Sequence, residues 1–82
     1  MKLHVHLSGS LLYVADVDSI PTVGSLVRIS SVNYFDGNYP GTIIEFPVTA
    51  SEPPEFDFTE KPPVVYLSAN GYTVVRAGVK RE

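Results

Sequence analysis

Hydrophobic and polar residues alternate along most of this chain with the period of two that is typical of β-strands. The apolar residues are mostly valine, isoleucine, tyrosine and phenylalanine, which favour a pleated, half-buried surface. Glycine, proline, Asn-Gly and Asp-Gly steps interrupt the pattern about every ten residues, as turns between short strands do. No segment combines helical periodicity with helix caps. The sequence therefore predicts an all-β fold.

The alternation predicts about six strands and defines which side chains face the core. The expected strands cover residues 2–7, 11–18, 25–30, 42–48, 64–69 and 72–77. The side chains expected to point inward from the first, third and fourth of these are Leu3, Val5, Leu7, Val27, Ile29, Ile44, Phe46 and Val48. Because Pro47 has no N–H to donate to a neighbouring strand, we expect strand 42–48 to be an edge strand or bulged there.

Two registers compete for the first hairpin. A two-residue loop at Gly9-Ser10 suits a type II′ turn, but it would turn Asp16 toward the core. A three-residue loop keeps Asp16 outside with Leu12 and Val14, and it turns inward Leu11, Tyr13, Ala15 and Val17. Burying an unpaired carboxylate costs several kcal/mol, whereas a turn preference is worth only about 1 kcal/mol. We therefore expect the second register, with room for a bulge.

The strongest turn signal is Asn70-Gly71. It predicts that segments 64–69 and 72–77 pair as an antiparallel hairpin closed by a type I′ turn. Residues 50–63 contain four prolines and four acidic residues, so we expect them to form a long, acidic, proline-rich loop. The tail, residues 79–82, is expected to fray.

Three segments resemble parts of SH3-like small barrels. Residues 24–29 resemble the opening strand of such a domain, residues 39–43 resemble the glycine that begins the next strand, and residues 64–67 with Gly71 resemble the closing hairpin. The resemblance leaves out the N-terminal hairpin and implies a fold but no function. We therefore expect a single small β domain over residues 1–82: a small barrel or a strongly bent antiparallel sheet, SH3-like in part.

Composition narrows the classes of function. The chain has 82 residues, which is enough for one compact core, and it has no cysteine, which excludes disulfides, thiol catalysis and thiolate metal sites. Its formal net charge is −3 and its six lysines and arginines are scattered, whereas nucleic-acid-binding domains are usually strongly basic. No apolar run is long enough for a membrane helix, and no signal peptide is evident. We therefore expect a cytoplasmic protein with neither nucleic-acid nor membrane partners.

One candidate metal site lies on the first strand. His4 and His6 are two residues apart on one face, a spacing at which two imidazoles can bind a transition metal. In the expected register Asp16 lies across the hairpin and could be a third ligand. Two solvated histidines on an outer face are the structural alternative. Because the pattern contains no further histidine, we expect no cofactor.

One candidate ligand site is an aromatic loop. Tyr34, Phe35 and Tyr39 surround Asp36-Gly37, and Arg28 is expected nearby. Exposed aromatic loops on small barrels can hold peptides or stack on ligand rings. The structural alternative is that these rings close one end of the core.

The final hairpin suggests a protein partner, because both of its faces are apolar. One small core can cover only one such face, and uncovered apolar patches usually mark interfaces. The residues expected to form the uncovered surface are Val64, Tyr66, Val75, Leu12 and Val14. The alternative is that the acidic loop folds back and covers this face with Phe56 and Phe58.

Catalytic chemistry has little support in the sequence. No serine lies in a Gly-x-Ser-x-Gly motif, and no glycine-rich phosphate loop precedes a helix. We therefore expect a non-enzymatic interaction module, either a homodimer or a module that binds another protein. The alternative is a small-ligand or metal-binding domain that uses the histidine face or the aromatic loop.

Overall fold

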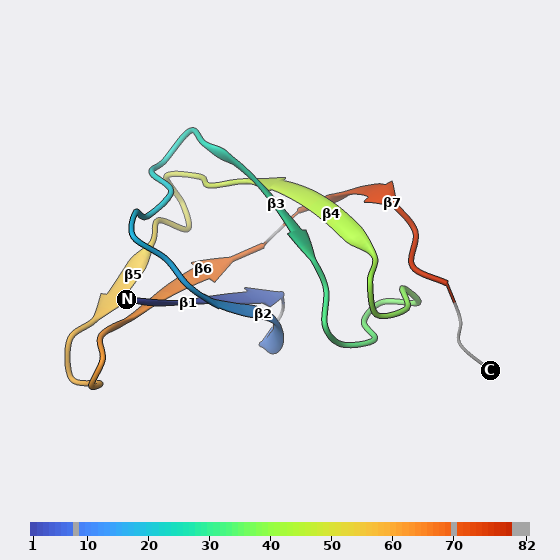
Figure 1. Ribbon diagram of the computed structural model, residues 1–82. Coiled ribbons are helices and arrows are strands. Elements are labelled where there is room, and N and C mark those ends of the chain that lie inside the picture. Colours follow the sequence, from blue (N-terminus) through green and yellow to red (C-terminus); the bar gives the residue numbers. More distant parts are fainter. Residues whose placement is uncertain (8, 70, 80–82) are drawn as a thin grey trace.

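The computed structural model describes residues 1–7, 9–69 and 71–79. Its strands are β1 (Lys2–Leu7), β2 (Ser10–Asp16), β3 (Leu26–Ser30), β4 (Ile43–Pro47), β5 (Glu55–Asp57), β6 (Val64–Ser68) and β7 (Thr73–Arg76). They form a four-stranded sheet, β2-β1-β6-β5, and a three-stranded sheet, β3-β4-β7 (Figure 1). The all-β prediction is confirmed. The two sheets do not close into a barrel, so the barrel prediction is wrong.

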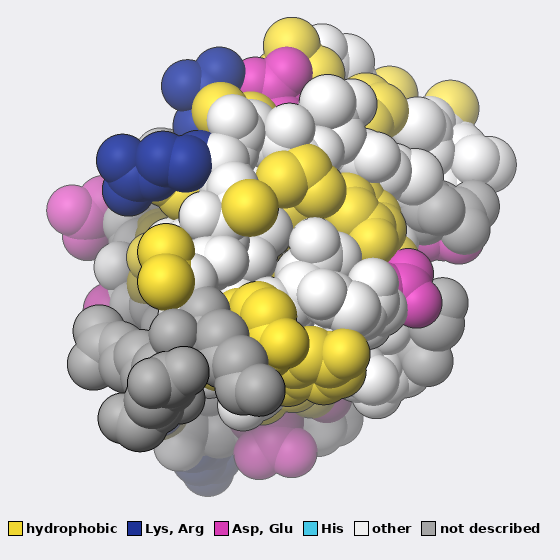
Figure 2. Space-filling view, turned by 90° about the vertical axis from the view of Figure 1, so that its right-hand side faces the viewer, with side chains coloured by type: hydrophobic (Ala, Val, Ile, Leu, Met, Phe, Trp, Pro, Cys, Tyr) yellow, Lys and Arg dark blue, Asp and Glu magenta, His cyan; other side chains and the backbone are white. Residues whose placement is uncertain are grey.

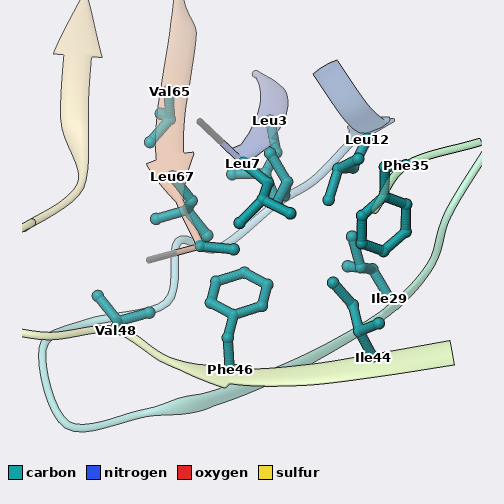
Figure 3. Close-up of a cluster of buried hydrophobic side chains, with 12 residues drawn as sticks. Leu3, Leu7, Leu12, Ile29, Phe35, Ile44, Phe46, Val48, Val65 and Leu67 are labelled. Carbon is teal, nitrogen blue, oxygen red and sulfur yellow. The ribbon is translucent and has the colours of Figure 1, made fainter. Parts of the chain in front are cut away.

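The core lies between the two sheets and follows the alternation of the sequence. From β4, Phe46 points toward Leu7 and Leu67 of the four-stranded sheet (Figure 3). Ile44 of the same strand lies with Ile29 of β3 near Phe35 (Figure 3). The inward-facing residues expected from β1, β3 and β4 are buried, except that Val27 is half-buried at the margin of the core.

Pro47 lies where β4 has a neighbour on one side only. β3 pairs with β4 from Ile43 to Pro47, whereas β7 pairs with it only from Ile43 to Glu45. The missing N–H of Pro47 therefore falls on a part of β4 that β7 does not reach. β4 is the central strand of its sheet and its register shift lies at Ile43/Ile44, so the prediction of an edge strand, or of a bulge at Pro47, is wrong.

The first hairpin contains the bulge that resolves the conflict between its two registers. The pairs Leu3 with Ala15 and Val5 with Tyr13 follow the expected register, and the pairing shifts between Val5 and His6. Leu12 is the extra residue at this shift, because its neighbours Tyr13 and Leu11 pair with the successive residues Val5 and His6, and its side chain is fully buried in the core. The prediction that Leu12 faces outward is therefore wrong, because the extra residue of a bulge does not follow the regular alternation of the strand.

The predicted final hairpin is not formed. β6 pairs in parallel with β1 and antiparallel with β5, while β7 crosses to the other sheet and pairs with β4. A type I′ turn needs positive φ at both central residues, and the φ of Gly71 is not in that region. Asn70 lies outside the described residues. The closing hairpin of the SH3-like resemblance is therefore absent, and one pair of strands in this fold is parallel.

Residues 50–63 are not a continuous loop. Residues 55–57 form β5, a short edge strand on β6. Phe56 and Phe58 stack on each other with ring centroids 6.1 Å apart, and both are exposed. They do not cover an apolar face in the way that the alternative interpretation required.

The C-terminal segment is described only as far as Val79, which is largely exposed. The other residues of the expected frayed tail, 80–82, lie outside the described part of the chain. Within residues 1–79, leaving aside positions 8 and 70, no helix is long and apolar enough to cross a membrane.

Candidate functional site

The two histidines of β1 lie on the outer face of the four-stranded sheet beside Tyr66. The ring centroids of His4 and His6 are 6.3 Å apart, and those of His4 and Tyr66 are 5.5 Å apart, with edge-to-face geometry. Register explains this cluster, because His4 pairs with Val14 on one side and with Tyr66 on the other. The Nε2 atom of His6 is buried and has no hydrogen-bond partner.

The structure does not assemble the expected three metal ligands. Asp16 pairs with Lys2, two residues along β2 from Val14, which lies opposite His4. Among the described residues, no group of three histidine, cysteine, aspartate or glutamate side chains could hold a metal ion. The histidine face therefore offers two imidazoles and a phenol.

The aromatic loop is divided between the core and the surface. Phe35 is buried and packs edge to face on Tyr72, with ring centroids 5.6 Å apart. Tyr34 and Tyr39 remain exposed and contact each other, with centroids 5.5 Å apart. Phe35 therefore closes one end of the core, as the structural alternative expected.

Arg28 does not belong to the aromatic loop. It lies in the middle of β3 and forms an ion pair with Glu45 of β4, with 2.7 Å between its Nη2 and the carboxylate Oε2. These two residues are direct partners in the β3–β4 register. The predicted association of Arg28 with the tyrosines is therefore not found.

Tyr72 links the loop to the start of β7. Its hydroxyl donates a hydrogen bond to Oδ2 of Asp36 at 3.2 Å, and Asn38 lies within 3.4 Å of the same hydroxyl. Burial raises the pKa of the Tyr72 hydroxyl above its ordinary value of 10.0, and the Asp36 carboxylate raises it further. The tight turn that presents Asp36 uses positive φ at this residue and at Gly37.

The predicted partner surface is also divided. Leu12 and Val64 are buried, so they cannot contact a partner, and that part of the prediction is wrong. Tyr66 is half-buried beside the two histidines, whereas Val14 and Val75 are exposed. Of the original set, only Val75 lies on β7.

β7 is the least covered strand of the fold. All four of its residues are exposed, with Val74 40% and Val75 46% accessible. Val74 pairs with Ile44 of β4, which is completely buried. The residues that bury Ile44 therefore do not extend far enough to bury Val74 on the neighbouring strand. Within the described part of the chain, β7 pairs with β4 and no strand pairs with its other edge. A register shift at Ile43/Ile44 inserts Val75 as an extra residue.

The segment after β7 is fixed to the loop that precedes β4. The Gly78 N–H donates to Oγ1 of Thr42 at 2.9 Å, and this hydroxyl donates to the Tyr39 carbonyl at 2.6 Å. A Cβ on Gly78 would lie only 2.6 to 2.8 Å from backbone atoms of Tyr39, Pro40 and Thr42. Only glycine permits this close approach, which holds the end of β7 in place.

Figure 2 shows the end of the molecule to which β7 runs, where hydrophobic side chains gather between basic and acidic groups. Exposed apolar residues near or on β7 in the fold include Val74, Val75 and Val79. Exposed apolar clusters that are rimmed by charged groups are typical of protein interfaces.

Two adjoining pockets lie near the start of β7 and the end of β6. These pockets, of about 500 and 360 Å³, share Ser51 and Ser68, and hydroxyl and carboxylate side chains dominate their linings. Neither His4 nor His6 is among the lining residues, although Ser68 is the register partner of His6 in the β1–β6 pair.

This chain was compared with protein families, curated proteins and solved structures. No family model, no curated protein and no solved structure matches this chain.

Proposed function

We propose that this protein is a non-enzymatic interaction module that binds an extended segment of a partner protein along the free edge of β7. The observation that carries the proposal is that β7 is paired on one side only while both of its central valines are exposed. Such an edge presents unpaired N–H and C=O groups to any incoming strand. Strand addition uses these groups for affinity and the alternating side chains for specificity.

The other edge strands carry features that oppose pairing, and this difference supports the choice of β7. β5 has only three residues, follows Pro53-Pro54 and carries two carboxylates. β2 is bulged, and β3 has an arginine at its centre. Short length, prolines, charges and bulges are the usual protections of an edge. β7 shares one of them, the bulge, but its centre is Val74-Val75 and its single charge is at its last residue, Arg76.

The direct test uses a synthetic peptide that copies residues 72–78 as a probe strand. We expect the peptide to shift the backbone amide NMR signals of β7 and to protect them from hydrogen exchange, because the added strand supplies their missing partners. A scrambled peptide of the same composition is the control. If the copied peptide at about 1 mM leaves the β7 amides unchanged, a concentration that would detect even weak binding, the proposed edge function is wrong.

A second candidate function is weak binding of a transition metal at the histidine face. The observation that favours it is the stacked pair His4 and His6, in which Nε2 of His6 is buried without a partner. Zinc or nickel titration followed by the NMR signals of the two imidazoles tests it. If equimolar metal shifts neither ring, this candidate is excluded.

A further inference from the structure

We propose that the strand bound by β7 is β7 of a second copy of this chain, aligned antiparallel about a twofold axis. This inference rests on the proposed function, because it names the partner of the same edge. Each copy would contribute its three-stranded sheet, β3-β4-β7, and the two sheets would join along β7 into one continuous sheet. Closed twofold dimers are the commonest solution to self-association among soluble proteins.

The geometry of strands limits the register of this dimer. Residues that face each other in an antiparallel pair point to the same side of the sheet, and successive residues point to opposite sides. A twofold axis through the sheet must therefore place one residue opposite its own copy. The centre of β7 offers for that position either Val74, which pairs regularly with Ile44, or Val75, the extra residue of the register shift.

Charge favours these two registers over the one centred on Arg76. Centring the axis on Arg76 would place two guanidinium groups opposite each other, which is unfavourable. Centring it on Val74 or Val75 moves the two Arg76 side chains toward opposite ends of the interface. The acid nearest in register is Glu45, opposite Thr73, and its carboxylate is already paired with Arg28 at 2.7 Å. Two copies can therefore meet along β7 without like charges in direct opposition.

Burial supplies the apolar part of the argument. Val74 and Val75 are 40% and 46% exposed in one copy. Whichever of the two valines lies on the axis would face the same valine of the second copy. Cross-strand β-branched pairs contribute to sheet stability. Because the edge has only four residues, we expect a weak dimer with a dissociation constant of roughly 10 μM to 1 mM.

Cross-linking tests the register, because the native chain contains no cysteine to interfere. Single variants Val74→Cys and Val75→Cys are oxidised at high protein concentration. Val23→Cys serves as the matched control, since Val23 is 49% exposed and lies in the turn before β3, away from β7 (Figure 1). Residues directly opposite each other have Cβ atoms about 4.5–5.5 Å apart, which a small shift brings within disulfide range.

We expect one of the two β7 variants to form a covalent dimer at least about tenfold faster than the control, since only the residue on the axis meets its own copy. Equal rates for all three variants would overturn the second-copy proposal. The peptide titration then separates the two failures. If the β7 peptide still binds the β7 edge although two intact copies do not meet there, the edge accepts an extended strand, and the interaction function stands without a second intact copy as the partner. If it does not bind, both proposals fail.

Discussion

Replacing Gly78 by alanine is the sharpest test of how β7 is held. The new Cβ would lie 2.6 Å from the Tyr39 carbonyl oxygen, 2.7 Å from that of Pro40 and 2.8 Å from the Thr42 nitrogen. These are backbone atoms, so no side chain can rotate away, and the contacts are about 0.6–0.8 Å shorter than ordinary van der Waals contact. Overpacking of this kind typically costs about 1–3 kcal/mol. We expect the free energy of unfolding to fall by that amount.

Gly71→Ala is the matched control for this change. Its Cβ would meet nothing within 4 Å, and its φ is outside the left-handed region. Such a substitution usually stabilises by about 0.4–1 kcal/mol through the unfolded chain. Urea denaturation measures the difference in free energy of unfolding between the two variants, provided that their m-values are unchanged. Hydrogen exchange of the residue 78 amide reports whether segment 77–79 detaches locally. If Gly78→Ala keeps both the wild-type midpoint and the wild-type amide protection, segment 77–79 is not docked on residues 39–42.

Two further predictions concern the first hairpin and the start of β7. Leu12→Ala should destabilise the protein by about 2–5 kcal/mol, and exposed Val14→Ala far less; equal urea midpoints would contradict the bulged register. Asp36→Asn should lower the raised pKa of Tyr72 toward 10.0, as followed by NMR of the tyrosine ring. Because the folded state holds this pKa above its unfolded value, the stabilisation it gives is complete below about pH 10 and is lost as pH rises through the folded pKa. An identical Tyr72 titration in both proteins would show that the carboxylate has no influence.

The elements of the fold were largely predictable from sequence, because burial of one sheet face imposes alternation. The inward sets of β1, β3 and β4 followed directly from this pattern. Leu12 was assigned wrongly because a bulge is one extra residue, and it leaves no mark in the local composition. β5 was missed because three residues between prolines are too few to show a period.

The pairing of strands was less predictable than their positions. Asn70-Gly71 is a hairpin signal, and turn chemistry is a local preference of about 1 kcal/mol. The burial of Val65 and Leu67 beside β1 involves far more apolar area, so long-range packing decided the partner of β6. Long-range packing also explains why the residues of the predicted partner surface do not lie together. Val64 was drawn into the core with β6, and Val75 was left exposed on β7.

The candidate sites were also predictable where they depend on alternation within one strand and not where they depend on the pairing of strands. Alternation placed His4 and His6 correctly on one face, but Asp16 lies opposite Lys2, two residues from the position opposite His4, and is not close enough to complete a metal site. The free edge of β7 could not be read from the sequence, because a strand that lacks a neighbour has the same local pattern as one that is paired on both sides.

Sedimentation equilibrium of the wild-type protein and of Val75→Lys tests the central claim most directly. We expect the apparent mass of the wild type to rise from 9.0 kDa toward twice that value as the concentration approaches about 1 mM. Val75→Lys should stay monomeric, because a charge at the centre of an edge opposes pairing, whereas Val23→Lys, of similar exposure, should associate like the wild type. A wild-type protein that remains at 9.0 kDa over this range, or a Val75→Lys variant that associates equally well, would contradict pairing through β7.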